Sequence, residues 1–343
     1  MKKVLITGVT GQDGSHMCDY LLKNTPHNIY GAIRRLSVKN HENILHLETE
    51  ARFQLINLDL NDAHSIIDAI IKIQPDFFIN FAAQSFVAGS WDYPIQTWET
   101  DSNSVLHILE SIRRFAPHCK FYNAGSSEEF GDVVYSPQDE KHPLRPQSPY
   151  GAAKCAARHI VRVYRKSYGL FAIQGWLFNH EGTRRGLDFV TRKISNTVAK
   201  IKHSIENKKN IPILELGNID AKRDWSDAED FMSGVWLMLN QKSPKNYVLS
   251  SGEMHTVREF LDESLKCANI KWISKGEGDQ ERYYTEDGGL FFQINPKFYR
   301  PAEVHELLGD CSRAEKEIGW KKKTSFSRLV KKMYEKDYSL LNK

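Results

Sequence analysis

The chain has 343 residues, of which 41% are hydrophobic and 26% are charged, and its formal net charge at pH 7 is only +4. This length and balance suit one large α/β unit with an appended lobe, and they exclude a disordered or fibrous protein. Short basic runs at 207–210, 319–324 and 329–336 are interpreted as solvated faces, with no nucleic-acid partner, because no zinc-finger or aromatic RNA-binding motif accompanies them.

The predicted elements alternate between strands and helices through the first half of the chain. Apolar, β-rich runs predict strands at 3–7, 29–33, 53–58, 76–82, 120–125 and 171–178. Helical patterns lie between them at about 13–24, 62–73, 101–115 and 150–168. This alternation predicts βαβ units and a doubly wound, Rossmann-like parallel sheet.

The second half is less regular. It shows a strand at 246–252 and helical patterns near 257–268 and 325–340. We expect a dinucleotide-binding domain over 1–178, with later segments near 212–252 returning to it. A smaller, interleaved substrate-binding lobe is expected mainly over 179–343.

The first turn, GVTGQDG at 8–14, follows the first predicted strand and opens the first predicted helix. Glycines there allow a tight turn that brings amide N–H groups against a pyrophosphate at a helix N-terminus. The G-x-x-G-x-x-G spacing resembles the extended branch of the short-chain dehydrogenase/reductase superfamily. The predicted dinucleotide contacts in this turn are Gly8, Thr10, Gly11, Gln12, Asp13 and Gly14.

The end of the second predicted strand indicates which dinucleotide binds. An acidic residue there would hold the ribose 2′-hydroxyl of NAD, but this chain has Arg34 and Arg35, which suit the 2′-phosphate of NADP. The alternative is that one of the two arginines is a surface residue. Loops after the third and fourth strands add contacts to the cofactor at Asp59, Leu60, Phe81, Ala82, Ala83, Gln84 and Ser85.

The string SPYGAAK places Tyr150 and Lys154 four residues apart, on one face of the helix that it begins. A free phenol, with a pKa near 10, is a poor base, but an ammonium group and an oxidised nicotinamide stabilise its ionised form. Tyr150 can then take the proton of a substrate alcohol while a hydride leaves the same carbon. After the glycine turn and four βα units, we predict that this pair is catalytic and contacts the cofactor.

The string YNAGSSEEFGD at 122–132 follows the fifth predicted strand and has two adjacent carboxylates. In the extended branch, a hydroxyl at this place binds the sugar C4 hydroxyl, and dehydration needs a further carboxylate. Ser126 is predicted to be that hydroxyl and Glu128 the acid/base, whereas Glu129 is predicted to point outward. The alternative is an acidic loop exposed to water.

Longer strings resemble the GDP-mannose 4,6-dehydratase family over nearly the whole chain. They lie at 177–194 (LFNHEGTRRGLDFVTRKI), 214–225, 299–310 and 317–330. The resemblance implies conversion of GDP-mannose to GDP-4-keto-6-deoxymannose by internal hydride transfer through bound NADP and loss of water, with no net redox change. It also implies cofactor contacts at His180 and Arg185. The GDP-sugar contacts that it implies are Ser85, Ser126, Glu128, Asn179, Val190, Lys193, Leu216, Gly217, Arg223, Arg300 and Glu303.

Departures from the family pattern leave alternatives open. The family's Ser-Thr-Ser-Glu-Leu-Tyr-Gly reads Gly-Ser-Ser-Glu-Glu-Phe-Gly at 125–131, and Phe86 replaces the usual histidine after Gln-Ser. A GDP-manno-heptose 4,6-dehydratase is therefore the first alternative. A GDP-sugar 4-reductase or epimerase is the second, and a non-enzymatic NADP-binding regulator is the third.

Partners and compartment follow from the resemblance and from the cysteines. The family implies dimers or tetramers, although the loop at 34–47 differs from the family's. Five separated cysteines without a C-x-x-C pair favour reduced thiols over disulfides or a metal site. The chain shows neither a signal-peptide core nor an 18-residue apolar stretch, so we expect a cytoplasmic protein without membrane contact.

Overall fold

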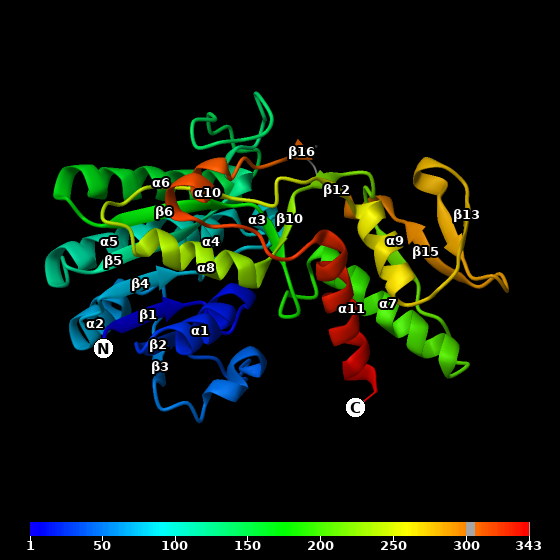
Figure 1. Ribbon diagram of the computed structural model, residues 1–343, viewed down its shortest axis with the longest axis horizontal. Coiled ribbons are helices and arrows are strands. Elements are labelled where there is room, and N and C mark those ends of the chain that lie inside the picture. The colour runs from blue at the N-terminus through cyan, green and yellow to red at the C-terminus, as the bar shows by residue number, and fades with distance from the viewer. Residues whose placement is uncertain (300–305, 343) are drawn as a thin grey trace.

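A seven-stranded parallel sheet forms the larger part of this computed structural model, which describes residues 1–299 and 306–342 (Figure 1). Its strand order is β11-β6-β5-β4-β1-β2-β3, and every neighbouring pair is parallel. The strands are β1 (Lys3–Thr7), β2 (Asn28–Ile33), β3 (Phe53–Asn57), β4 (Phe77–Asn80), β5 (Lys120–Ser126), β6 (Ala172–Leu177) and β11 (Val248–Leu249). The predicted doubly wound sheet is confirmed, and the last strand is shorter than expected.

Helices cover both faces of this sheet because successive side chains of its strands point to opposite faces. Val4 and Ile6 of β1 join one apolar cluster with α1 (Gln12–Asn24) and α8 (Ala228–Leu239). Leu5 joins the cluster on the other face. The helices there are α2 (Ala63–Ile73), α5 (Ser104–Phe115) and α6 (Pro149–Tyr168). Strands buried on both faces read as continuous apolar runs, which is why the sequence predicts them well.

The smaller lobe has its own sheet and its own apolar core. Its four strands, in the order β13-β14-β15-β8, are β13 (Ile273–Lys275), β14 (Arg282–Tyr284), β15 (Leu290–Ile294) and β8 (Leu214–Leu216). They pack with α7 (Val190–Glu206), α9 (Val257–Cys267) and α11 (Phe326–Leu341). Helices α9 and α11 match the predicted patterns, whereas α7 and α8 are not among the predicted elements.

The two parts are joined by several crossings of the chain. After α7 and β8 the chain returns to the large sheet through α8 and β11, and then re-enters the lobe at α9. Short pairs lie at the crossings: β7 (Asn179–Glu181) with β10 (Trp225–Asp227), and β9 (Lys222–Arg223) between β12 (His255–Thr256) and β16 (Glu306–Leu307). The remaining helices are α3 (Gly89–Asp92), α4 (Pro94–Trp98) and α10 (Ser312–Ile318).

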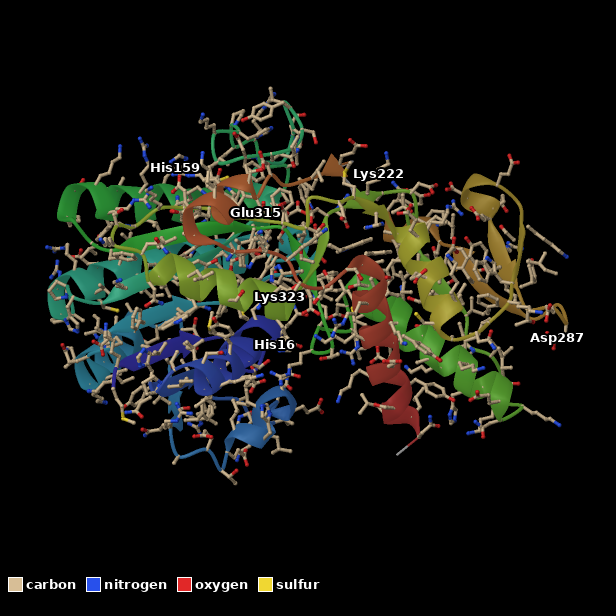
Figure 2. All side chains as sticks on the ribbon, in the orientation of Figure 1. His16, His159, Lys222, Asp287, Glu315 and Lys323 are labelled. Carbon is tan, nitrogen blue, oxygen red and sulfur yellow. The ribbon has the colours of Figure 1, made fainter. Side chains whose placement is uncertain are left out.

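The outer surface carries charged side chains and also exposed apolar ones such as Val38 and Ile95. His159, Glu315 and Lys323 are exposed and project into solvent from the larger unit and its C-terminal connection (Figure 2). No helix in the described ranges is long and apolar enough to cross a bilayer.

Candidate active site

A cavity of about 680 Å³ opens at the carboxyl ends of β1, β2, β3 and β4. Ligands of doubly wound sheets bind at this edge. Every residue predicted to contact the dinucleotide lines this cavity except Tyr150, Lys154 and His180. The loop after β2 adds side chains that were not predicted, among them Lys39 and His41.

The glycine turn has the backbone that its sequence indicates. Gly8 has φ +73°, and a Cβ at this position would lie 2.8 Å from the amide nitrogen of Ala82. Gly11 caps α1 with no side-chain hydrogen bond, so the first amides of the helix keep no partner of that kind. These amides, at the positive end of the helix dipole, suit a pyrophosphate.

Asp13 and His180 form an ion pair at the floor of this turn, with 2.9 Å between the carboxylate and Nε2. Burial alone would raise the pKa of Asp13, but the charges of His180 and Arg185 hold it well below its usual range. Burial opposes the charge on His180, and Asp13 outweighs it, so the pKa of His180 is raised. Arg185 lines the cavity and stacks on Phe189 at 3.5 Å. His180 does not line the cavity; it holds in place Asp13, which does.

Tyr150 and Lys154 lie in the first turns of α6, where the sequence itself starts the helix. Ser148 is the N-cap, accepting a hydrogen bond from the Gly151 amide at 3.0 Å, and Pro149 occupies the first helical position. Lys154 is buried, donates to the carbonyl of Ala124 at 3.1 Å, and has its nitrogen 5.6 Å from the centre of the Tyr150 ring.

The side chain of Tyr150 is 8% exposed. Burial and the carboxylates of Asp101 and Glu128 raise the pKa of its phenol, and a hydrogen bond with Ser126 lowers it. Chemistry with Tyr150 as a base therefore needs further positive charge in the site.

Ser126 and Glu128 adjoin this tyrosine at the end of β5. Ser126 is half-buried, and its hydroxyl accepts a hydrogen bond from the amide of Glu128 at 3.2 Å. Glu128 is 8% exposed, which rules out the reading of this stretch as an acidic loop in water. Through Ser126 the structure brings the predicted hydroxyl, carboxylate and phenol into one place.

Glu129 is a correction to the sequence-based expectation. It was predicted to point outward, but it is fully buried, and both of its oxygens are paired with Arg158 of α6. The prediction failed because the two carboxylates are equivalent in sequence. The partner that draws Glu129 inward lies 29 residues further on.

Asp101 is a second residue that the sequence reasoning missed. It lies in a π-helical turn, Glu99–Asn103, and is 1% exposed. One carboxylate oxygen accepts the amide of Gln84 at 2.8 Å, and burial, partly offset by Lys154, raises the pKa of Asp101 to about 6. Its other oxygen has no hydrogen-bond partner in the described part of the chain. No motif marks Asp101, because only the tertiary structure brings it to Lys154.

The predicted GDP-sugar residues lie along the crossings between the two parts. Asn179 is on β7, Val190 and Lys193 are on α7, and Arg223 is on β9. Leu216 and Gly217 end and follow β8, and Lys193 meets Phe298 at 3.7 Å beside them. Burial, partly offset by Glu215, lowers the pKa of Lys193. Ser85 lines the cavity, and Arg300 and Glu303 lie outside the described residues.

The side chains present suit a dinucleotide. Gln12 and Gln84 line the cavity, and within the described ranges their buried Oε1 atoms accept no hydrogen bond. The same holds for the buried Oδ1 of Asn179, which lies on β7 outside the cavity lining. Buried polar atoms without partners are costly, so such atoms at a cavity indicate a polar ligand. The exposed Arg34 and Arg35 add positive charge at the far end of the cavity. In the same ranges, no cluster of His, Cys, Asp or Glu could hold a metal ion.

Comparisons with known proteins agree on the family. A family model described as GDP-mannose 4,6 dehydratase matches residues 5–333. The GDP-mannose 4,6 dehydratase of Drosophila melanogaster is 41% identical, over 100% of this chain and 87% of its own length.

Two solved structures resemble this chain in fold. One is dTDP-glucose 4,6-dehydratase of Bacillus anthracis in complex with NAD, with a TM-score of 0.79 at 18% identity, covering 98% of this chain and 96% of that one. The other is RMD of Pseudomonas aeruginosa with NADPH, with a TM-score of 0.76 at 20% identity, covering 99% and 100%.

Proposed function

The chain belongs to the GDP-mannose 4,6-dehydratase family, and from that premise we propose that it is a hydro-lyase that converts GDP-mannose to GDP-4-keto-6-deoxymannose. The observation that carries this proposal is the grouping of a hydroxyl (Ser126), a buried carboxylate (Glu128) and a phenol (Tyr150). The dinucleotide cavity is linked to this group through Gln84, which lines the cavity and donates its backbone amide to Asp101, a charged neighbour of Tyr150. A reductase or epimerase needs the hydroxyl and the phenol but has no use for the carboxylate.

We propose that the cofactor is NADP, held by the glycine turn, by Gln84 and by the arginines after β2. When bound, a nicotinamide accepts a hydride and returns it within one turnover, and its oxidised form supplies positive charge that favours the ionised phenol. The arginines support NADP over NAD because two guanidinium groups line the cavity where the 2′-phosphate would lie.

The residues of this chain perform the proton transfers. The phenolic oxygen of Tyr150 takes the proton of the sugar C4 hydroxyl. Ser126, hydrogen-bonded to Tyr150, relays this proton from the C4 hydroxyl to the phenolic oxygen. The resulting 4-ketone acidifies C5. Glu128 then removes the C5 proton and delivers it to the departing C6 hydroxyl, which leaves as water. The 4-ketone with a C5–C6 double bond that remains needs the hydride back at C6 and one proton at C5, and this proton balances the one that Tyr150 took from the C4 hydroxyl. The buried nitrogen of Lys154 lies beside the ring of Tyr150.

The nucleotide part of the substrate is assigned to the lobe. Lys193 and Arg223 are cations close to the crossings of the chain, and together they can neutralise a diphosphate. Lys193 is well suited because burial destabilises its charged form, and a bound phosphate would stabilise that charge again.

A GDP-manno-heptose is the second candidate substrate, favoured by Phe86. This residue replaces a family histidine, is 40% exposed, and packs edge-on against Phe189 with ring centres 6.0 Å apart. Phe189 directly precedes Val190, and its ring also contacts the guanidinium of Arg185. A phenyl ring in place of the histidine removes a hydrogen-bonding side chain, so selection between a hexose and a heptose can differ here from the family's.

The test is incubation of the purified protein with GDP-mannose and, separately, with GDP-manno-heptose, followed by mass spectrometry. We expect loss of one water without added NADPH. No loss from either sugar would reject the dehydratase. Glu128→Gln is expected to abolish the loss, with the exposed Glu315→Gln as the matched control; wild-type turnover by Glu128→Gln would reject the assigned acid/base.

A further inference from the structure

A buried ion pair lies directly behind the catalytic residues. Glu129 is fully buried and Arg158 is 5% exposed. The guanidinium binds both oxygens of the carboxylate, with Nη2 2.9 Å from Oε1 and Nε on Oε2. Arg158 also donates to the carbonyls of Gln174 at 2.6 Å and of Gly175 at 3.2 Å, and its guanidinium stacks at 3.5 Å on the ring of Trp176.

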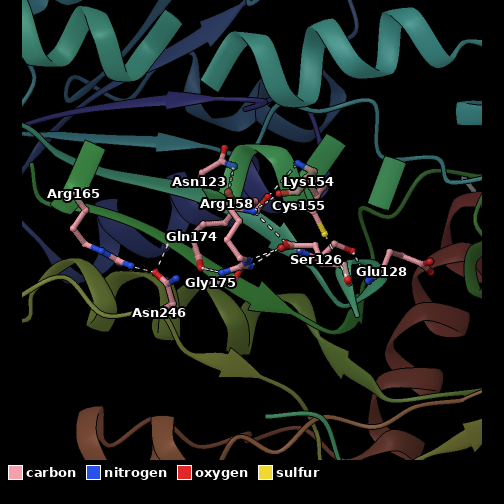
Figure 3. A network of polar contacts seen from close by, with 12 residues as sticks. Asn123, Ser126, Glu128, Lys154, Cys155, Arg158, Arg165, Gln174, Gly175 and Asn246 are labelled. Carbon is pink, nitrogen blue, oxygen red and sulfur yellow. Dashed lines mark hydrogen bonds and ion pairs between the residues drawn. The ribbon is translucent and has the colours of Figure 1, made fainter. Parts of the chain in front are cut away.

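The pair holds the catalytic strand end and the catalytic helix at the same time. Glu129 Oε1 accepts the backbone amide of Ser126 at 2.9 Å. It also accepts the side-chain amide of Gln174 at 3.2 Å, and that same amide donates to the carbonyl of Lys154 at 2.9 Å. Thus one carboxylate fixes the residue that carries the catalytic hydroxyl and, through Gln174, the residue that carries the catalytic ammonium. Ser126, Gln174 and Lys154 are labelled in Figure 3.

The network continues across the sheet to the cofactor cavity. Gln174 accepts from Asn123, Asn123 from Asn80, and Asn80 from Thr7, at 2.8, 2.7 and 2.5 Å. Thr7 in turn accepts the amide of Ala82, and both residues line the cavity. Side chains of β6, β5, β4 and β1 therefore form one buried row between the dinucleotide cavity and the catalytic residues.

The sequence around Ser126 is adapted to this pair. A Cβ on Gly125 would lie 2.2 Å from the carbonyl oxygen of Gly175, 2.6 Å from Arg158 Nη2 and 2.7 Å from Glu129 Oε1, so the neighbouring strand and the ion pair together require glycine at that position. Positions 125 and 129 are two of those at which the chain departs from the family pattern of Ser and Leu. Both departures thus border the same ion pair.

We propose that the Glu129–Arg158 pair positions Ser126 and Lys154 relative to each other, and so sets the rate of the chemical step; this inference rests on the proposed function. A simple gain in stability is the weaker explanation, because the desolvation of a buried ion pair often cancels its attraction. Positioning has a direct physical reason, since the pair is the shared anchor of two catalytic segments. Displacements of about 1 Å in such segments can cost on the order of 100-fold in rate.

The first variant is Arg158→Lys, which keeps the charge but loses the two-pronged contact with Glu129 and the contacts with the β6 carbonyls. Arg165→Lys is the matched control. It lies on the same helix and also binds a β6 carbonyl, that of Ala172, together with Asn246 (Figure 3). Among the described residues its side chain hydrogen-bonds neither Glu129, Ser126 nor Lys154, and it is linked to Gln174 only by way of Asn246, which accepts the Gln174 backbone amide. The double variant Glu129→Leu with Arg158→Met removes both charges, so neither is left buried without a partner.

Two readouts separate positioning from stability and from the proposed function. In dehydration of GDP-mannose we expect kcat of Arg158→Lys to fall on the order of 10- to 100-fold, with KM within about threefold of the wild type. Independently of activity, hydrogen exchange of the peptide covering 122–131 is expected to quicken about tenfold or more. Peptides of the lobe and all peptides of Arg165→Lys should keep wild-type exchange.

The outcomes are distinct. If the wild type does not dehydrate GDP-mannose, the proposed function fails, and the exchange experiment still tests the anchor. Wild-type kcat, or wild-type exchange at 122–131, in a folded Arg158→Lys or double variant would overturn the inference. If neither variant folds while Arg165→Lys does, the pair is a stability element and the proposal is rejected.

Discussion

Removal of Arg34 and Arg35 is the sharpest test of the proposed cofactor. Both side chains are exposed, follow the end of β2 and line the cavity. Hydrogen bonds to charged groups contribute about 1.5–3 kcal/mol each, whereas exposed ion pairs contribute only about 0.2–1 kcal/mol. For two exposed arginines facing one phosphate, we take about 1–3 kcal/mol in total. The double variant Arg34→Ala, Arg35→Ala should therefore bind NADPH about 5- to 150-fold more weakly.

The assay is fluorescence titration of NADPH and of NADH with wild type and variant in the same buffer. NADH affinity should change by less than about threefold, because the 2′-hydroxyl gains nothing from these cations. The wild-type preference for NADPH should shrink as salt is raised, since screening weakens exposed charges. Arg328→Ala, an exposed arginine of α11, is the control and should change neither affinity.

Two results would refute this reasoning. A wild type that binds NADH as tightly as NADPH would remove the basis for NADP. Equal loss of both nucleotides in the double variant would show that the arginines hold the loop at 34–47 or the pyrophosphate, and do not read the 2′ position.

Three further predictions concern the cavity and its charges. Burial, partly offset by Lys154, raises the pKa of Asp101 from 3.8 to about 6, so its ionisation costs stability once the pH exceeds the unfolded value. Asp101→Asn should raise the free energy of unfolding by about 2–3 kcal/mol at pH 8 and leave it unchanged at pH 3.5 in urea melts; equal gains at both would contradict this. The pKa of Asp13 is lowered in the folded protein, so its charge stabilises the fold at pH values above its unfolded pKa. The pKa of His180 is raised, so the stability that its charge contributes is present at low pH and is lost as the pH rises through its folded pKa. Asp13→Asn should therefore cost more stability in urea melts at pH 6 than at pH 9, by about 1–2 kcal/mol, and a loss independent of pH would refute the ion pair. Gly8→Ala places a Cβ 2.8 Å from the Ala82 amide at φ +73°, which costs at least about 1–2 kcal/mol, so thermal melts should show a lower Tm and a smaller rise with NADPH; an undiminished rise would argue against a pyrophosphate at this turn.

The strands, the glycine turn and the start of α6 were predictable because their causes are local. Buried parallel strands appear as continuous apolar runs, and Ser148 with Pro149 is a helix start that depends on neighbouring residues alone. Helix α7 was missed, although it carries Val190 and Lys193. Only its first residues, 190–194, fall within the string that resembles the family, and its apolar side faces α9 and α11, which come much later in the chain.

The carboxylates of this site show where local information ends. Glu128 and Glu129 are adjacent and chemically identical, so sequence spacing alone assigned one to catalysis and the other to solvent. The structure buries both, and it assigns Glu129 to Arg158 because a charge inside a protein requires a partner. The burial and raised pKa of Asp101 could not be predicted for the same reason, since its environment is formed by Gln84 and Lys154, which lie elsewhere in the chain.

By itself the sequence determined the Rossmann-like sheet, the cavity at its carboxyl edge and the family, because these depend on periodicity and on contiguous motifs. Only the tertiary structure decided which carboxylates are buried, which cation each one meets, and that Ser126 and Lys154 share an anchor in Glu129. Burial and charge pairing depend on residues far apart in the chain, and the energy of a charge is set by what the fold packs around it.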